Sequence, residues 1–243
     1  PTALNESAYP AVVLSFTATN PSTAATDVAF MFTLPMGGWT DCSYNDGNGK
    51  AFPAASTYQA CSAACTVGNN CASWEFADAS AVCLLNADIP YTTHKVGAHC
   101  GVRTDGGWTQ SNEQSNALVW SQRLGGNSTS PTAGDITLLG VSDVPGTTVS
   151  LLVEDDPAAL WAAFQNGCSA DDALPQVASH GAVSISASVP AGGNVTLSIV
   201  FAWHFPNRDF SHQVLGNMYT ELWPSSAAVA TELGTSARLK QVV

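Results

Sequence analysis

The sequence predicts a mainly β protein: an antiparallel β-sandwich with a small α+β, disulfide-stapled insert and a C-terminal helical linker. Three observations lead to this fold class. Short runs that alternate in the manner of half-buried strands occur on both sides of a cysteine-rich stretch. That stretch lies between two Gly-Gly-Trp motifs, at residues 37–39 and 106–108, and holds six of the seven cysteines. Apolar residues within 225–243 follow the spacing of a helix.

The domain boundaries are expected at the two Gly-Gly-Trp motifs. Residues 1–38 would form the first part of the sandwich and 39–107 the insert. Residues 108–215 would form the second part of the sandwich, and 216–243 a helical linker toward a further domain. An insert whose two ends lie close together fits into a surface loop at a small entropic cost.

Two segments before the insert, residues 9–19 and 27–34, have strand patterns, and the turn residues Asn20-Pro21-Ser22 lie between them. We expect these strands to form an antiparallel hairpin. Asp156-Pro157 indicates the N-cap and first residue of a helix over 158–166. Further strands are expected at 117–120, 135–141, 147–153, 183–189 and 195–204.

Within the insert, Ser56-Thr57 is placed to cap a short helix. This helix would carry Cys61 and Cys65 on one face, because residues four apart in a helix lie one above the other. A helix packed on a small sheet by disulfides can fold despite a thin apolar core. The strands of that sheet are expected at 71–76, 82–85 and 100–102.

The charge balance limits the classes of partner. The chain has 7 Lys and Arg against 19 Asp and Glu, a net charge of −12. Because nucleic-acid binding depends on clustered Lys and Arg, that function is excluded, as is attraction to an anionic membrane surface. No apolar run approaches the ~18 residues of a membrane-spanning helix, so we expect no membrane span.

The cysteine spacing indicates a disulfide framework, which persists in oxidising, extracellular surroundings. The competing interpretation is zinc, but Cys61-x3-Cys65 is the only paired spacing, and no second pair or His pair follows. Cys168 is left over, either as a buried free thiol or as the partner of a cysteine elsewhere. The cysteines expected to form disulfides are Cys42, Cys61, Cys65, Cys71, Cys83 and Cys100.

Three N-glycosylation sequons agree with secretion, at Asn5, Asn127 and Asn194. Asn127 directly follows a Gly-Gly turn, the exposed setting that glycosylation needs. Together with the cysteines, these sequons predict a secreted glycoprotein.

Acidic residues cluster at 154–156 and 171–172. We interpret them as helix caps and solvated turns, with calcium binding as the alternative, because clustered oxygens suit that ion. A retaining glycosidase needs two carboxylates about 5 Å apart in different environments, which sequence neighbours in turns do not supply. The five histidines show no zinc-site spacing. We therefore expect no catalytic residue, no cofactor and no glycoside hydrolysis by this chain alone.

The tryptophans divide into two groups by position. Trp74, Trp161 and Trp203 lie in predicted strands or helices and are expected in the core. Trp39 and Trp108 lie at the ends of the insert, where they would pack together or contact a glycan or protein partner.

The six cysteine positions, with CASW at 71–74 and CLL at 83–85, resemble a PAN/apple module. The resemblance covers only the insert, which is a smaller part of the chain than the predicted sandwich. It implies three disulfides, and it implies that the insert binds a glycan or a protein. The implied pairs are Cys42–Cys100, Cys61–Cys83 and Cys65–Cys71.

The rest of the chain resembles the N-terminal β-sandwich of glycoside hydrolase family 116, the family of non-lysosomal glucosylceramidase and bile-acid β-glucosidase. In that family the catalytic carboxylates lie in a helical barrel after the sandwich, so the resemblance transfers no catalytic residue to this chain. The motifs that carry it are YPAVV at 9–13, LWAAF at 160–164, PAGG at 190–193, FAWHFP at 201–206, Tyr219-Thr220 and Trp223.

Two functions follow as hypotheses. In the first, the chain is the non-catalytic N-terminal part of an extracellular β-glucosidase-like glycoprotein, and its insert binds a glycan or a protein. In the second, it is a structural glycoprotein that self-assembles into a filament or coat through the insert and exposed strand edges. Departures from the family pattern at His204 and Met218 favour the second. A helical barrel with paired acids after Val243 would favour the first.

Overall fold

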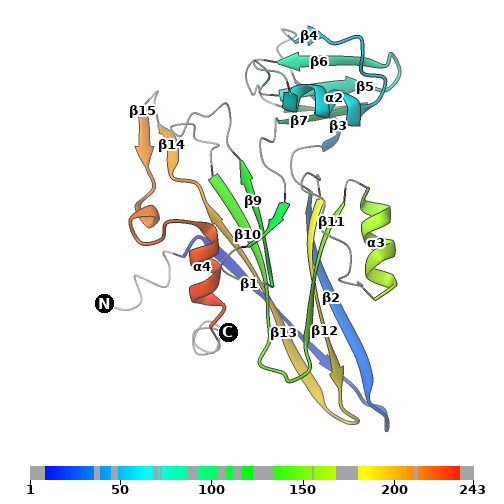
Figure 1. Ribbon diagram of the computed structural model, residues 1–243, viewed down its shortest axis with the longest axis vertical. Coiled ribbons are helices and arrows are strands. Elements are labelled where there is room, and N and C mark those ends of the chain that lie inside the picture. Colours follow the sequence, from blue (N-terminus) through cyan, green and yellow to red (C-terminus); the bar gives the residue numbers. More distant parts are fainter. Residues whose placement is uncertain are drawn as a thin grey trace. The chain divides into compact units, whose positions relative to one another are not determined.

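The structure is a computed structural model that describes residues 9–35, 39–44, 49–67, 71, 73–86, 92–102, 108–111, 116–122, 134–154, 156–167, 180–210 and 213–235 (Figure 1). It divides into two compact units. The sandwich unit consists of Pro1–Leu34, Gly107–Ser121 and Thr129–Val243. The disulfide-linked unit consists of Pro35–Gly106 with Gln122–Ser128. The chain as a whole is mainly β, as the sequence predicts. No helix in the described ranges is long and apolar enough to span a membrane.

The first sheet of the sandwich unit has five strands, with β13 between β1 and β10. β1 pairs antiparallel with β13 along its whole length, from Ala11 opposite Ala202 to Thr19 opposite Asn194. β10 pairs antiparallel with the other side of β13. β13 is therefore an interior strand of this sheet, paired on both sides. The strands in spatial order are β1 (Ala11–Thr19), β13 (Asn194–His204), β10 (Gly134–Val141), β9 (Ala117–Gln122) and β8 (Trp108–Gln110).

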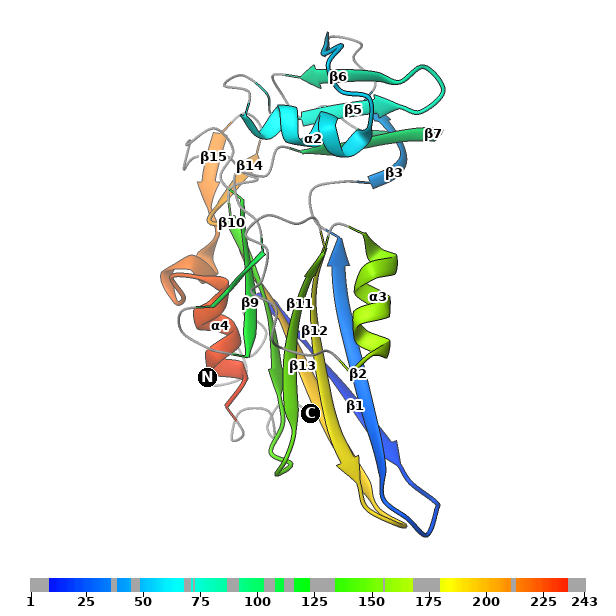
Figure 2. The same cartoon turned by 45° about the vertical axis from the view of Figure 1, so that its right-hand side comes forward.

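The second sheet has three strands, in the order β11 (Thr148–Glu154), β12 (His180–Val189) and β2 (Thr26–Pro35). The expected hairpin of β1 and β2 is wrong, because these consecutive strands lie in different sheets. β12 and β13 are also consecutive and also divide between the two sheets. The consecutive strands β10 and β11 divide in the same way, so the chain passes from one sheet to the other at all three connections. Figure 2 shows the β1–β2 and β12–β13 connections together at one end of the sandwich.

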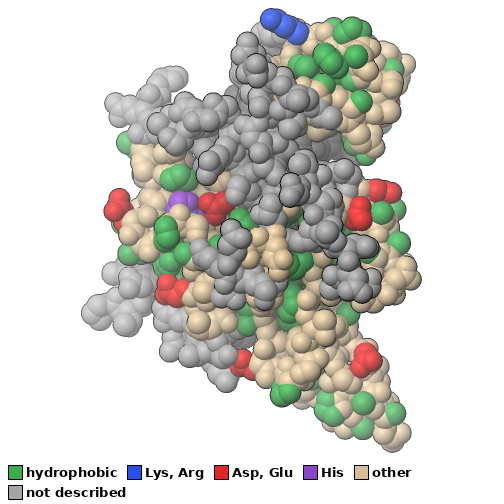
Figure 3. All heavy atoms as spheres, viewed as in Figure 1, with side chains coloured by type: hydrophobic (Ala, Val, Ile, Leu, Met, Phe, Trp, Pro, Cys, Tyr) green, Lys and Arg blue, Asp and Glu red, His purple; other side chains and the backbone are tan. Residues whose placement is uncertain are grey.

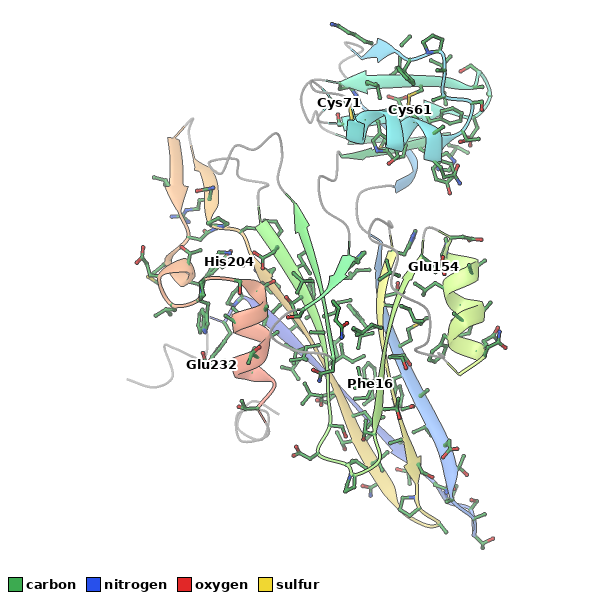
Figure 4. All side chains as sticks on the ribbon, viewed as in Figure 1. Phe16, Cys61, Cys71, Glu154, His204 and Glu232 are labelled. Carbon is green, nitrogen blue, oxygen red and sulfur yellow. A yellow bond between two sulfur atoms is a disulfide. The ribbon has the colours of Figure 1, made fainter. Side chains whose placement is uncertain are left out.

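The sandwich core lies between these sheets. Along β13, Val195, Leu197 and Ile199 point into it, since alternate residues of a strand share a face. The rings of Phe16 and Phe30, from β1 and β2, stack with their centroids 4.8 Å apart across the sheets (Figure 4). Each buried side chain of this size contributes about 1.5–3 kcal/mol.

The opposite face of the first sheet is covered by α4 (Ser226–Leu233). Val229, Ala230 and Leu233 of this helix pack against Leu139 and Val200 of the sheet. The Ser225 side chain caps α4 by accepting a hydrogen bond from the Ala228 N–H at 3.1 Å. This part of the segment expected to be a linker is therefore capped and packed on the sandwich, while residues 236–243 lie outside the described residues.

The remaining elements of the sandwich unit are α3 (Pro157–Gln165), β14 (Asn207–Phe210), β15 (Gln213–Gly216) and the 3-10 helix η1 (Met218–Glu221). α3 begins as the sequence predicts, with Asp156 at the N-cap and Pro157 at the first helical position. Only Leu160 of α3 is buried, so Trp161, expected in the core, is instead 51 % exposed. A nearly all-apolar helix gave no periodicity from which its buried face could be predicted.

The disulfide-linked unit packs one helix, α2 (Tyr58–Val67), on a five-stranded sheet. Its buried core contains Ala55, Trp74, Phe76 and four cysteines. The expected strands at 71–76 and 82–85 are present within two residues as β5 and β6. The strands in spatial order are β3 (Trp39–Tyr44), β7 (Thr92–Val102), β5 (Ser73–Ala77), β6 (Val82–Asn86) and β4 (Lys50–Ala51).

Candidate functional site

The disulfides of the second unit hold α2 on its sheet. Cys61 and Cys65 lie one turn apart on the buried face of α2, as the spacing predicts. Cys61 is bonded to Cys83 of β6, with an S–S distance of 2.07 Å, and Cys65 to Cys71, at 1.99 Å. Both are pairs that the PAN/apple resemblance implies. Cys100 is also disulfide-bonded. Its expected partner Cys42 lies in β3, but the side chain of Cys42 is outside the described residues.

A pocket of about 340 Å³ opens beside the N-terminal end of α2. It is formed by the start of that helix, the end of β5 and the turn between β5 and β6. We call it the Tyr58 pocket. It is lined by Ser56, Thr57, Tyr58, Gln59, Phe76, Asp78 and Ala81.

Local sequence explains how the pocket is built. The Thr57 hydroxyl oxygen accepts a hydrogen bond from the Ala60 N–H at 3.2 Å, so the helix begins at Tyr58, as the cap predicts. The Tyr58 ring stacks on the His99 ring of β7, with centroids 4.4 Å apart and an interplanar angle of 17°. His99 Nε2 in turn lies 3.1 Å from Asp78 Oδ2. Phe76, 4 % exposed, contributes an apolar wall.

The described lining of the pocket combines aromatic, hydroxyl, amide and carboxylate side chains. Among the described residues that line it, Asp78 is the only acidic one, whereas a retaining glycosidase uses a pair of carboxylates. Across the described residues, no group of three His, Cys, Asp or Glu side chains could hold a metal ion. On the face drawn in Figure 3, acidic side chains lie at separate places rather than in one patch.

Sequence reasoning did not single out the Tyr58 pocket. Tyr58, Asp78 and His99 come from three different elements and lie about twenty residues apart along the chain. The helix cap at Thr57 was the only signal that marked this part of the insert.

The candidate residues at the ends of the insert differ in outcome. Trp108, for which packing and contact with a glycan or partner were the two alternatives, is fully buried. Its indole lies against the backbone of Gly181, where an added Cβ would come within 2.2 Å of the ring. Trp39 lies in β3 opposite Cys100, and its side chain is outside the described residues.

The structure describes two residues of the acidic clusters, Glu154 and Asp156. Asp156 Oδ1 accepts a hydrogen bond from the Ala158 N–H at 2.9 Å, the helix-cap role that was predicted. Glu154 is the last residue of β11 and pairs with His180 of β12. Asp155, Asp171 and Asp172 lie outside the described residues.

A second polar cluster lies beneath α4. Asp135 Oδ1 accepts hydrogen bonds from the Ser226 N–H, at 2.6 Å, and from the Ser226 hydroxyl. His204 Nδ1 lies 3.6 Å from Asp135 Oδ2, and Thr137 hydrogen-bonds Ser226 at 2.7 Å (Figure 4). Because Ser226 is bonded to the aspartate and not to the histidine, this is no nucleophile arrangement. It fixes the start of α4 to β10.

The three sequon positions are only partly placed. Asn194 is the exposed first residue of β13, an accessible position for a glycan. Asn5 and Asn127 lie outside the described residues, as does Cys168.

Comparison with protein families gives one match. The family model described as "beta-glucosidase 2, glycosyl-hydrolase family 116 N-term" matches residues 1–239. The match therefore spans both units. No curated protein matches the chain.

Proposed function

The chain belongs to the family of glycosyl-hydrolase family 116 N-terminal domains, and we propose that it is the non-catalytic N-terminal segment of an extracellular β-glucosidase-like glycoprotein. The family match over nearly the whole chain is the observation that carries this proposal. In this role the sandwich unit is a structural domain of a glucosidase-like parent. The disulfide-linked unit adds a binding module for a glycan or a protein.

The engaged carboxylates support a non-catalytic role. Asp156 caps α3, and Asp135 anchors the start of α4. Glu232 accepts hydrogen bonds from the Trp223 indole, at 2.7 Å, and from the Tyr9 hydroxyl. A catalytic acid and nucleophile must both be free to face the sugar. Asp156, Asp135 and Glu232 already accept hydrogen bonds that hold parts of the fold together, so they do not meet this requirement.

Disulfides and sequons support the extracellular part of the proposal. The disulfides of this unit, which include Cys61–Cys83 and Cys65–Cys71, are compatible with an oxidising compartment. Mass spectrometry of protein from its native source tests the glycoprotein, with a glycan expected on Asn127 and also on Asn194 and Asn5. An unmodified Asn127 would count against secretion.

Activity assays test the non-catalytic role directly. The purified chain should not hydrolyse an aryl β-glucoside, whereas the same chain with the domain that follows it in the parent should. Turnover by the chain alone that is lost in Asp155→Asn or Asp171→Asn would overturn the proposal. If the parent protein has no following domain with a pair of catalytic acids, the proposal that the parent is glucosidase-like is wrong.

A second candidate is a structural glycoprotein that self-assembles. β2, ten residues long, is an edge strand of the second sheet, and such edges can pair with another copy. Sedimentation of the purified chain over a range of concentrations tests this. Growth into large oligomers would favour assembly, and a monomer at all concentrations would exclude it.

A further inference from the structure

We propose that the Tyr58 pocket binds a neutral saccharide, an uncharged ligand with neighbouring hydroxyl groups. The inference rests on the proposed role of the disulfide-linked unit as a binding module. It adds the position of the site, the residues that form it and the chemical class of the ligand.

The size and walls of the pocket suit a sugar ring. Its volume of about 340 Å³ is at the lower end of the range for small-molecule sites. Tyr58 gives it an aromatic wall, and the C–H faces of a sugar pack well on aromatic rings. Phe76, which is 4 % exposed, contributes only the edge of the apolar core beneath it. Stacking on His99 holds the Tyr58 ring in one orientation, which lowers the entropy lost when a ligand binds.

The polar groups of the pocket are hydrogen-bond donors and acceptors that suit the hydroxyl groups of a sugar. Asp78 uses Oδ2 for His99, and within the described residues Oδ1 has no partner, so it remains available to accept. The side chains of Ser56 and Gln59 and the Tyr58 hydroxyl likewise form no hydrogen bond within the part of the chain that is described. The Thr57 oxygen accepts from Ala60, but its own hydroxyl proton can still be donated. Each sugar hydroxyl both donates and accepts a hydrogen bond. Because the pocket offers both donors and acceptors, it can form hydrogen bonds with two adjacent hydroxyl groups.

The charge of the pocket excludes anionic ligands. Among the described lining residues, Asp78 is the one that carries a charge and none is Lys or Arg, and the Asp78 side chain is 48 % exposed. Sulfated glycans, phosphates and acidic peptides would meet a carboxylate without a compensating cation. A neutral glycan gains a charge-assisted hydrogen bond from the same carboxylate.

NMR titration of the intact, ¹⁵N-labelled chain tests the proposal. The probes are the methyl glycosides of glucose, galactose, mannose and N-acetylglucosamine, each added separately. At least one should shift the backbone amide signals of residues 56–59 and 78–81. Asp78→Asn and Tyr58→Ala should each weaken that binding at least tenfold. Asp27→Asn, which removes an exposed carboxylate of β2, is the matched control and should leave the affinity unchanged.

Each other result overturns the proposal. These results are no shift with any methyl glycoside, shifts confined to other residues, or binding that Asp78→Asn leaves intact in a well-dispersed spectrum. Response only to a heparin octasaccharide, or only to choline, would show an anion or a cation site instead. If Tyr58→Ala disturbs α2, Gln59→Ala replaces it, with weaker binding expected. If the chain binds no saccharide at the Tyr58 pocket and hydrolyses no glucoside, the saccharide site is wrong but the non-catalytic role remains supported. If the chain hydrolyses a glucoside, the non-catalytic role is wrong whatever the pocket binds.

Discussion

At the scale of single residues, Ala81 is held in an unfavourable backbone conformation. Its φ is +50°, while no other described non-glycine residue has a positive φ. It closes the turn between Ala77 and Val82, which pair as the ends of β5 and β6. This conformation costs a residue with a Cβ about 1–2 kcal/mol, whereas glycine adopts it freely.

We predict that Ala81→Gly raises the free energy of unfolding of the disulfide-linked unit by about 0.5–1 kcal/mol, after the larger unfolded-state entropy of glycine is subtracted. Denaturant unfolding of the oxidised chain measures it. Ala79→Gly in the same turn is the control, and it should lower stability because Ala79 has no positive φ. The same change in stability for both variants would contradict this explanation.

Gly181 is required by the close approach of Trp108 to its backbone. An alanine Cβ at this position would lie 2.2 Å from the indole, far inside van der Waals contact. We predict that Gly181→Ala lowers the free energy of unfolding of the sandwich unit by about 1–3 kcal/mol. Gly216→Ala, where an added Cβ meets nothing within 4 Å, should change it by less than about 0.5 kcal/mol. Thermal unfolding measures both, and an equal loss in the two variants would count against this contact.

The same contact shows what the sequence could not reveal at this scale. Trp108 lies in a Gly-Gly-Trp motif at the end of the insert, a position that left both packing and exposure open. Its burial depends on Gly181, more than seventy residues away, because a strand with a glycine leaves room for a ring. The Tyr58 pocket was missed for a similar reason, since Asp78 reaches Tyr58 only through His99 of another strand.

At the scale of elements, the strand patterns were predicted well but their pairing was not. β10 to β13 and the N-terminus of α3 lie where alternation and the Asp-Pro cap predict them. β1 and β2, however, satisfy the same alternation whether they pair with each other or with strands far along the chain. Their separation is fixed by the loop that joins them, at residues 20–25, through its bonds to the loop after β12.

Asn20 makes that connection between the two loops. It is 6 % exposed, and its side-chain amide donates to the Val189 carbonyl at 3.1 Å and to the Ala24 carbonyl at 2.7 Å. We predict that Asn20→Ala destabilises the sandwich unit by about 1–3 kcal/mol, because it removes the side-chain donor to the buried Val189 carbonyl. Chemical denaturation provides the measurement. Ser22→Ala at the exposed edge of the same loop should cost less, and a larger loss there would refute the role assigned to Asn20.

At the scale of the whole molecule, the two units derive their stability from different sources. The sandwich core is built from side chains such as Phe16, Ile185 and Leu197 and contains no cysteine among its described buried residues. In the disulfide-linked unit, cysteines make up four of the seven described residues in the buried cluster between α2 and its sheet. The sequence predicted this division from cysteine position alone, because disulfides compensate for a core too small to stabilise a fold.

This difference predicts a selective effect of reduction. Reductant should unfold the disulfide-linked unit, since losing native disulfides costs a small domain about 2–5 kcal/mol and removes the links between α2 and its sheet. In an NMR spectrum of the whole chain, signals of residues 49–86 should collapse to random-coil positions. Signals of β1, β10 and β13 should persist, because their core depends on no disulfide. The same concentration of oxidised dithiothreitol is the control and should change neither set. Simultaneous loss of both sets would show that the sandwich requires the folded insert, and the two units would then form one cooperative structure.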